Sequence, residues 1–169
     1  MRFFSGFSFK DEEYLFEKNL NRSEFTVTGF SYGSILAFEY VLDSEKRVDT
    51  LQLFSPAFFQ ESSEAFIRMQ LLYFKKDRKK YVKTFIKNSF FPKDVPENIE
   101  IKKDNYSDLE KLLRFQWKKE DIQKVLDKGV KIEVFLGEKD RIIDSTKAFN
   151  FFKQFGEVCL IKDTGHSLN

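Results

Sequence analysis

The chain has 169 residues, of which 41% are hydrophobic and 33% charged, and its formal net charge is +2. These values predict a single globular domain, 1–169, and exclude a disordered or low-complexity chain. The lone cysteine, Cys159, excludes an internal disulfide, and charges at 10–13 interrupt the apolar N-terminus too early for a signal peptide or membrane span. We therefore expect a cytoplasmic protein with no membrane partner.

The hydrophobic pattern alternates between strands and helices. In chain order it predicts a strand at 1–4, a helix at 11–20, a strand at 25–28, a helix at 34–42, strands at 48–54 and 130–136, a helix at 146–155 and a strand at 157–162. Strands separated by helices imply right-handed β-α-β units. The predicted fold class is α/β, with about five parallel strands in a sheet that is covered on both faces.

The region 58–117 interrupts this alternation. It lacks clear strands, and its apolar residues recur at helical spacing, first from Phe66 to Phe85 and again from Leu109 to Phe115. We expect a helical insertion within the single domain, lying over the end of the sheet in the position of a lid.

A Gly-x-Ser-x-Gly sequence, Gly29-Phe30-Ser31-Tyr32-Gly33, lies between a predicted strand and a predicted helix. A serine on so tight a strand-to-helix turn has a strained backbone and an exposed hydroxyl. The two glycines let the turn close because they lack side chains. The N-terminus of the following helix offers N–H groups and a positive dipole to an oxyanion.

Asp140 and His166 each follow a predicted strand, and His166 is the only histidine of the chain. Loops at the carboxyl ends of parallel strands gather at one edge of a sheet, so we expect both residues beside Ser31. Serine, aspartate and histidine, in that order, is the chain order of the α/β-hydrolase catalytic triad. The pattern therefore predicts a serine hydrolase.

Each of these residues also has a purely structural interpretation. Ser31 would belong to a turn whose glycines serve packing alone, and His166 would be a capping or surface histidine. Asp144 and Asp163 lie close to Asp140 in the sequence and are alternative partners for the histidine.

With these motifs and Ser5-Gly6-Phe7, the chain resembles a compact α/β hydrolase over nearly its whole length. Larger members have eight strands in the order 1-2-4-3-5-6-7-8, and this chain matches the third and the fifth to eighth. The missing strands come from one edge, so the resemblance implies a minimal α/β-hydrolase fold whose sheet has no gap. It also implies that Ser31, Asp140 and His166 are catalytic and that the backbone N–H groups of Phe7 and Tyr32 form the oxyanion hole.

More narrowly, the segments 1–7, 29–33, 48–57 and 129–140 resemble the short carboxylesterases of biotin synthesis. Those enzymes hydrolyse the methyl ester of pimeloyl-acyl-carrier protein to pimeloyl-acyl-carrier protein and methanol. Two alternatives stay open: another serine hydrolase, such as a thioesterase or a small-ester carboxylesterase, and a catalytically silent hydrolase-like binding protein.

The chain departs from the family pattern at two places. It has Ser5-Gly6 where many relatives have His-Gly before the oxyanion-hole residue. It also stops at Asn169, without the usual C-terminal helix, so we expect His166 to be mobile or to be held by a partner or substrate.

The predicted lid insertion is strongly basic. Between 68 and 93 it contains nine basic residues and one acidic residue, Asp77, whereas the whole chain carries a net charge of only +2. Acyl carrier protein is acidic, so the expected partner is an acyl carrier protein bearing a pimeloyl methyl ester, with no nucleic acid as a partner. The predicted docking residues are Arg68, Lys75, Lys76, Arg78, Lys79, Lys80, Lys83 and Lys87.

Four of these, Lys76, Lys80, Lys83 and Lys87, fall at helical spacing on one predicted face. The alternative interpretation of the basic run is a solvated helix face, or a surface that attracts nucleic acid. No metal and no cofactor are expected, because one histidine and a single cysteine leave few soft ligands and no glycine-rich nucleotide loop is present.

Overall fold

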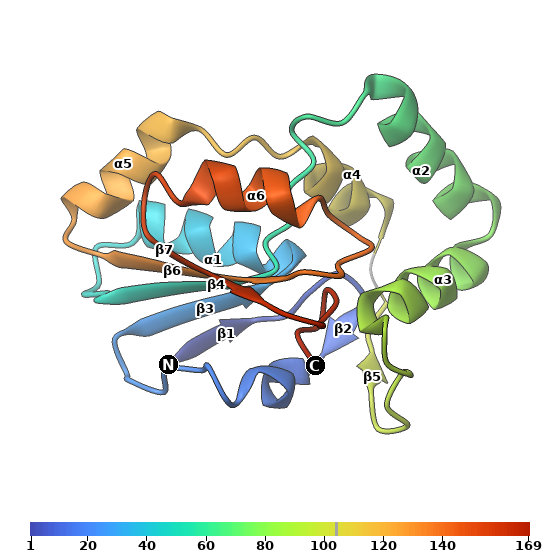
Figure 1. The fold of residues 1–169 in the computed structure, drawn as a ribbon. Coiled ribbons are helices and arrows are strands. Elements are labelled where there is room, and N and C mark those ends of the chain that lie inside the picture. The colour runs from blue at the N-terminus through green and yellow to red at the C-terminus, as the bar shows by residue number, and fades with distance from the viewer. Residues whose placement is uncertain (104) are drawn as a thin grey trace.

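The computed structural model describes residues 1–103 and 105–169, in which five parallel strands form one sheet in the order β1-β3-β4-β6-β7 (Figure 1). The strands are β1 (Arg2–Phe4), β3 (Thr26–Phe30), β4 (Thr50–Phe54), β6 (Lys131–Gly137) and β7 (Glu157–Ile161). The predicted α/β class and five-stranded parallel sheet are confirmed. Every residue of β3 and β4 is buried, as expected for the central strands of a covered parallel sheet.

Three helices cover one face of the sheet, namely α1 (Tyr32–Asp43), α5 (Lys119–Asp127) and α6 (Ser145–Phe152) (Figure 1). The helix α1 follows β3 directly and buries most of its length, because its sequence is apolar on nearly every side. Among the described residues, no helix is both long enough and apolar enough to cross a bilayer.

The helix predicted at 11–20 is wrong in extent. The segment forms only a 3-10 helix, η1 (Glu12–Phe16). The ring of its last residue, Phe16, stacks on the ring of Phe54 with centroids 4.6 Å apart. Beyond it, the side chain of Gln52 on β4 holds the non-helical backbone at 19–21. Its Nε2 donates to Asn19 O at 2.9 Å, and its Oε1 accepts from Asn21 N at 2.8 Å.

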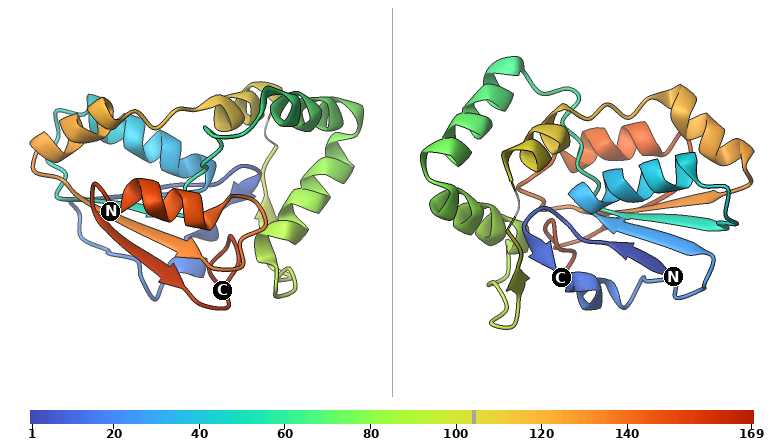
Figure 2. Two further views of the ribbon diagram at one scale, coloured as in Figure 1. Left: turned by 45° about the horizontal axis from the view of Figure 1, so that its top comes forward. Right: turned by 180° about the vertical axis from the view of Figure 1, so that it is seen from behind.

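The stretch 58–117 contains α2 (Glu64–Lys76), α3 (Arg78–Phe90) and α4 (Tyr106–Arg114). Figure 2 shows from two sides that α2 and α3 project beyond one end of the sheet. The stretch also contains a strand that the sequence did not reveal, β5 (Glu100–Ile101), which pairs antiparallel with β2 (Phe9–Lys10). A two-residue strand is too short to show the alternating pattern from which strands are predicted.

The basic run of the insertion does not lie on one continuous helix. The helix α2 ends at Lys76, and Asp77 caps α3 by accepting from Lys80 N at 3.0 Å. The prediction that Lys76 shares a helix face with Lys80, Lys83 and Lys87 is therefore wrong. Aspartate is a preferred helix-capping residue because its carboxylate satisfies the free N–H groups of the first turn.

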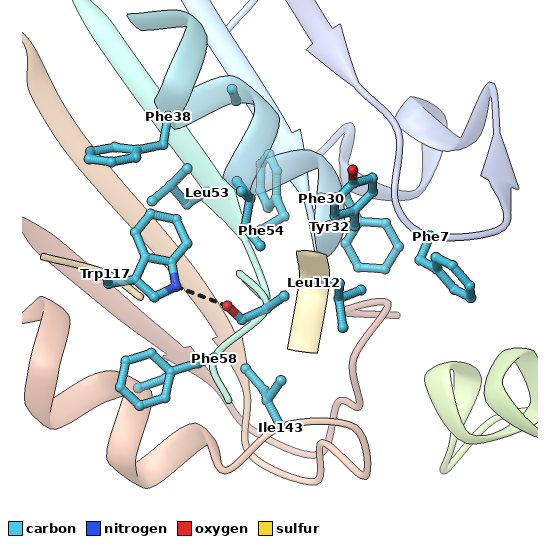
Figure 3. Packing of buried hydrophobic residues seen from close by; sticks show 14 of the residues in the cluster. Phe7, Phe30, Tyr32, Phe38, Leu53, Phe54, Phe58, Leu112, Trp117 and Ile143 are labelled. Carbon is cyan, nitrogen blue, oxygen red and sulfur yellow. Dashed lines mark hydrogen bonds between the residues drawn. The ribbon is translucent and has the colours of Figure 1, made fainter. Parts of the chain in front are cut away.

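The two ends of this insertion meet in the hydrophobic core. Trp117 is buried, and its indole N–H donates to Ala57 O at 2.9 Å, as the dashed line in Figure 3 marks. Its backbone N–H donates to Gln60 Oε1 at 2.8 Å. Phe38 packs against the indole with ring centroids 5.2 Å apart. The chain therefore leaves the sheet after β4 and returns to α5 at nearly the same place.

Candidate active site

Ser31 lies at the junction of β3 and α1, with φ 53° and ψ −115°. This is a strained conformation for a residue other than glycine, and strain of this kind concentrates at functional sites. The flanking glycines are required by close backbone contacts. A Cβ on Gly29 would lie 2.2 Å from Gly33 O, and one on Gly33 would lie 1.9 Å from Phe4 O.

The structure brings Ser31, His166 and Asp140 into one hydrogen-bonded chain. His166 Nε2 lies 2.9 Å from Ser31 Oγ, and His166 Nδ1 lies 2.6 Å from Asp140 Oδ2. The three side chains are buried. When Nδ1 carries the proton and donates to the carboxylate, Nε2 is free to accept the serine proton. This is the geometry of a serine nucleophile with its base and the group that orients the base.

Asp140 is held from both of its oxygens. While Oδ2 contacts the histidine, Oδ1 accepts from Ile142 N at 2.7 Å and from Ile143 N at 3.1 Å. The two alternative aspartates have other partners. Asp144 caps α6 by accepting from Lys147 N at 3.0 Å, and Asp163 forms an exposed ion pair with Lys139.

The loop that carries His166 is held by the end of α3. Ser167 N donates to Ser89 O at 2.9 Å, and a Cβ on Gly165 would lie only 1.6 Å from Phe91 O. In this structure, therefore, the insertion of the same chain holds the loop of His166, while the expected mobility stays a prediction. Its ring is fully buried, with the ring of Phe30 5.2 Å away.

The two predicted oxyanion donors lie beside the serine turn. Tyr32 is the first residue of α1, and Phe7 follows β1, which pairs with β3 in parallel so that Phe4 aligns with Gly29. Figure 3 shows Phe7, Phe30 and Tyr32 toward the same end of the core, away from Trp117. Their role as backbone donors to an oxyanion stays a prediction.

A cavity of about 610 Å³ lies between the insertion and the loop that follows β6. Phe85 lines it and also packs edge-on against the His166 ring at 6.5 Å. The pKa of Tyr81, which also lines the cavity, is raised to about 12 by burial, and its hydroxyl donates to Gln70 Oε1 at 3.0 Å. The apolar lining includes Phe59, Phe66, Leu109, Leu112 and Leu113.

The eight predicted docking residues do not share one surface. Arg78, Lys79, Lys83 and Lys87 line a separate groove of about 850 Å³ along α3. The other four are distributed elsewhere: Lys76 and Lys80 line the cavity, Arg68 pairs with Glu64 at 3.2 Å, and the ammonium of Lys75 lies 4.3 Å from the centre of the Tyr106 ring.

Three further basic residues line the groove. Lys93 belongs to the predicted basic run but not to the predicted docking set, and sequence reasoning missed Lys102 and Arg141. Arg141 lines both the groove and the cavity, and its guanidinium lies over the Phe91 ring. Its position directly after Asp140 was visible in the sequence, but nothing in the local pattern indicated that it would reach α3.

No family model matches the chain, and no curated protein matches it. Solved structures do. The chain is 18% identical to naproxen esterase from Bacillus subtilis (TM-score 0.59), covering 85% of this chain and 53% of that one. It is 15% identical to MenH from S. aureus, with a TM-score of 0.59 over 97% of this chain and 85% of that one. It is 10% identical to BioG from Haemophilus influenzae, with a TM-score of 0.62 over 98% of this chain and 87% of that one.

These likenesses show the fold: the chain has the α/β-hydrolase fold, and its structural neighbours include esterases. The chain spans only about half the length of several of them, 54% of a hydrolase from Bacillus subtilis and 59% of an esterase from Exiguobacterium antarcticum. It spans most of MenH and BioG.

Proposed function

We propose that the protein is a serine carboxylesterase that hydrolyses the methyl ester of pimeloyl-acyl-carrier protein to pimeloyl-acyl-carrier protein and methanol. The observation that carries the hydrolase part is the hydrogen-bonded chain from Ser31 through His166 to Asp140, built on a strained turn. The substrate part rests on the resemblance of four segments to the short esterases of biotin synthesis. The match to BioG, which covers 87% of that chain, also supports the substrate part.

In this reaction Ser31 Oγ attacks the ester carbonyl while His166 Nε2 accepts its proton. Asp140 holds the imidazole in place and stabilises the imidazolium. The N–H groups of Phe7 and Tyr32 stabilise the tetrahedral oxyanion, each contributing about 3 kcal/mol. Methanol leaves with the proton from His166. A water molecule, deprotonated by His166, then hydrolyses the acyl-enzyme, and the proton returns to Ser31.

The cavity and the groove support a substrate with an apolar chain on an acidic carrier. No triad residue lines the cavity, but Phe85 lines it and also packs against the His166 ring. Its many apolar lining residues suit a chain of methylenes. The groove has seven basic residues and one acidic residue, Asp94, in its lining, and an apolar floor that includes Val82 and Ile86. Because Asn88 and Arg141 line both spaces, we infer that the carrier docks in the groove and its prosthetic arm passes these two residues.

The hydrolase part is tested with a fluorophosphonate probe, which labels activated serines. We expect wild type to be labelled and Ser31→Ala to remain unlabelled, with His166→Asn strongly slowed. Equal labelling of wild type and Ser31→Ala would contradict an activated Ser31 and favour the silent binding protein.

The carrier part is tested by comparing two substrates, pimeloyl methyl ester on acyl carrier protein and free dimethyl pimelate. We expect Lys83→Glu with Lys87→Glu to raise KM for the carrier-linked ester about tenfold, since each surface contact contributes roughly 0.5–1 kcal/mol. Turnover of dimethyl pimelate should not change.

The matched control is Lys18→Glu with Lys46→Glu, which changes the net charge equally at exposed positions outside the groove. If both double variants affect the carrier-linked ester alike, or if wild type does not prefer the carrier-linked ester, the docking proposal is wrong. The small-ester carboxylesterase then becomes the better interpretation.

A further inference from the structure

A buried carboxyl group lies beneath the loop that follows β1. Glu12, at the start of η1, is fully buried, and its Oε1 accepts from Gly6 N at 2.7 Å. Burial raises the pKa of the Glu12 carboxyl, and the hydrogen bond from Gly6 opposes that shift. A fully buried glutamate is rare unless it has a specific partner. The proposed reaction gives Glu12 no direct part, so its position calls for a separate explanation.

The partner of Glu12 adjoins the peptide that carries a predicted oxyanion donor. The carbonyl of Gly6 and the N–H of Phe7 belong to one planar peptide unit, so fixing the direction of one fixes the other. Gly6 O accepts from Phe9 N at 3.2 Å, while Gly6 N donates to Glu12. The bond from Phe9 N holds this unit directly, on the side opposite the Phe7 N–H. The bond to Glu12 holds the preceding Ser5–Gly6 peptide, which is joined to this unit at the Gly6 Cα.

The same loop has little freedom to move as a whole. Ser8 and Asp11 have φ of 63° and 55°, a left-handed conformation that is uncommon for serine and more frequent for aspartate. The Phe7 ring is buried against Phe74 and Phe85 of the insertion, at 6.0 and 5.6 Å between centroids. Loss of the Glu12 contact would therefore change the local peptide orientation at Gly6 more than the position of the loop.

We propose that Glu12 is a positioning residue for the oxyanion hole: by holding Gly6 N–H it fixes the peptide before Gly6, and so limits the rotation at Gly6 that would redirect Phe7 N–H. The proposal rests on the proposed hydrolase function. An acceptor oxygen is what the contact needs, so a neutral side chain of the same shape can replace the carboxyl.

The test measures kcat and KM of the full-length protein with p-nitrophenyl butyrate as a simple ester probe. We expect Glu12→Gln to keep kcat within threefold, because the amide oxygen still accepts from Gly6 N. Glu12→Leu should lower kcat about tenfold or more with KM nearly unchanged, since an oxyanion donor acts mainly in the transition state. Glu12→Asp, whose side chain is one methylene shorter, should lower kcat as Glu12→Leu does. It serves as the second test variant if the leucine variant does not fold.

The control for a purely structural effect is Gln52→Leu, which removes a buried side chain that also holds backbone groups under the sheet. It should lose stability but keep kcat. If kcat is unchanged in folded Glu12→Leu and Glu12→Asp, or if kcat falls equally in Gln52→Leu, the positioning role of Glu12 is wrong but the proposed function is not affected. A wild type that neither turns over esters nor reacts with a fluorophosphonate would overturn the proposed function and this inference with it.

Discussion

The proposed catalytic edge of the sheet, which carries Ser31, Asp140 and His166, differs from the basic insertion in what fixes the side chains. Ser31, His166 and the Asp140 carboxyl are buried, and each has a hydrogen-bond partner within the triad. The lysines of α3, by contrast, are exposed and divide between two hollows. A site of the first kind depends on individual atoms, whereas one of the second kind depends on the total charge of a surface. Substitutions should therefore have large effects at the edge of the sheet and graded effects on the insertion.

The largest effect should come from Asp140→Asn. By removing the carboxylate that orients the imidazole, it should lower kcat about 10⁴-fold, with little change in the melting temperature. The matched control is Asp144→Asn, because Asp144 caps α6 and asparagine caps helices equally well. Ester-hydrolysis kinetics of both variants give the answer. A small loss in Asp140→Asn, or equal losses in the two, would contradict the assigned triad.

Gly33→Ala should be the next most damaging change. Its Cβ would lie 1.9 Å from Phe4 O, a backbone atom that can move only with β1, so we expect a loss of roughly 3 kcal/mol or more in the free energy of unfolding. Gly129→Ala is the control, because a Cβ there meets nothing within 4 Å and the cost is the positive φ of 81°, about 1 kcal/mol. Urea denaturation measures both. Similar losses would mean that the serine turn tolerates a side chain.

A pH effect should separate the insertion from the sheet. The Tyr81 pKa is raised to about 12 from the model-compound value of 10.0, so the folded state holds its phenol proton more tightly than the unfolded chain. Stability is then fully present below pH 10 and is lost as pH rises through about 12, by up to roughly 3 kcal/mol. Tyr81→Phe lacks this loss. Denaturation curves of the two proteins between pH 9 and 12 should diverge, and parallel curves would contradict the prediction.

The smallest effect should be that of salt. Raising sodium chloride from 50 to 300 mM shortens the range of surface electrostatics, so KM for the carrier-linked ester should rise severalfold. Hydrolysis of dimethyl pimelate, which carries no charge, should change little. If both substrates respond equally, salt acts on the catalytic edge and not on the groove.

The central features of the proposed catalytic edge could be predicted from sequence because they depend on local patterns. Ser31, Asp140 and His166 each follow a strand, and parallel strands carry their following loops to a common edge. Glu12 could not be recognised in this way. Its place beneath Gly6 depends on a short 3-10 helix that replaces the expected helix at 11–20, and Gln52, a residue of β4, supplies the contacts that divert the chain after it.

The insertion was predicted less well because its arrangement depends on contacts between distant residues. The break at Asp77 did have a local signal, since aspartate commonly caps helices, but the continuous lysine spacing suggested one helix face. No local pattern indicated that Arg141 would lie over Phe91, or that the end of α3 would hold the His166 loop through Ser89.

The hydrogen bond between the Trp117 indole and Ala57 O joins the two ends of the insertion, so the insertion leaves the α/β domain and returns to it at one place. An insertion whose two ends lie side by side can change in length or sequence without a change in the order of the strands in the sheet. One contact limits that freedom here, because Ser167 N, beside the His166 imidazole, donates to Ser89 O in the last turn of α3. A replacement insertion would have to recreate that support to keep the imidazole in place.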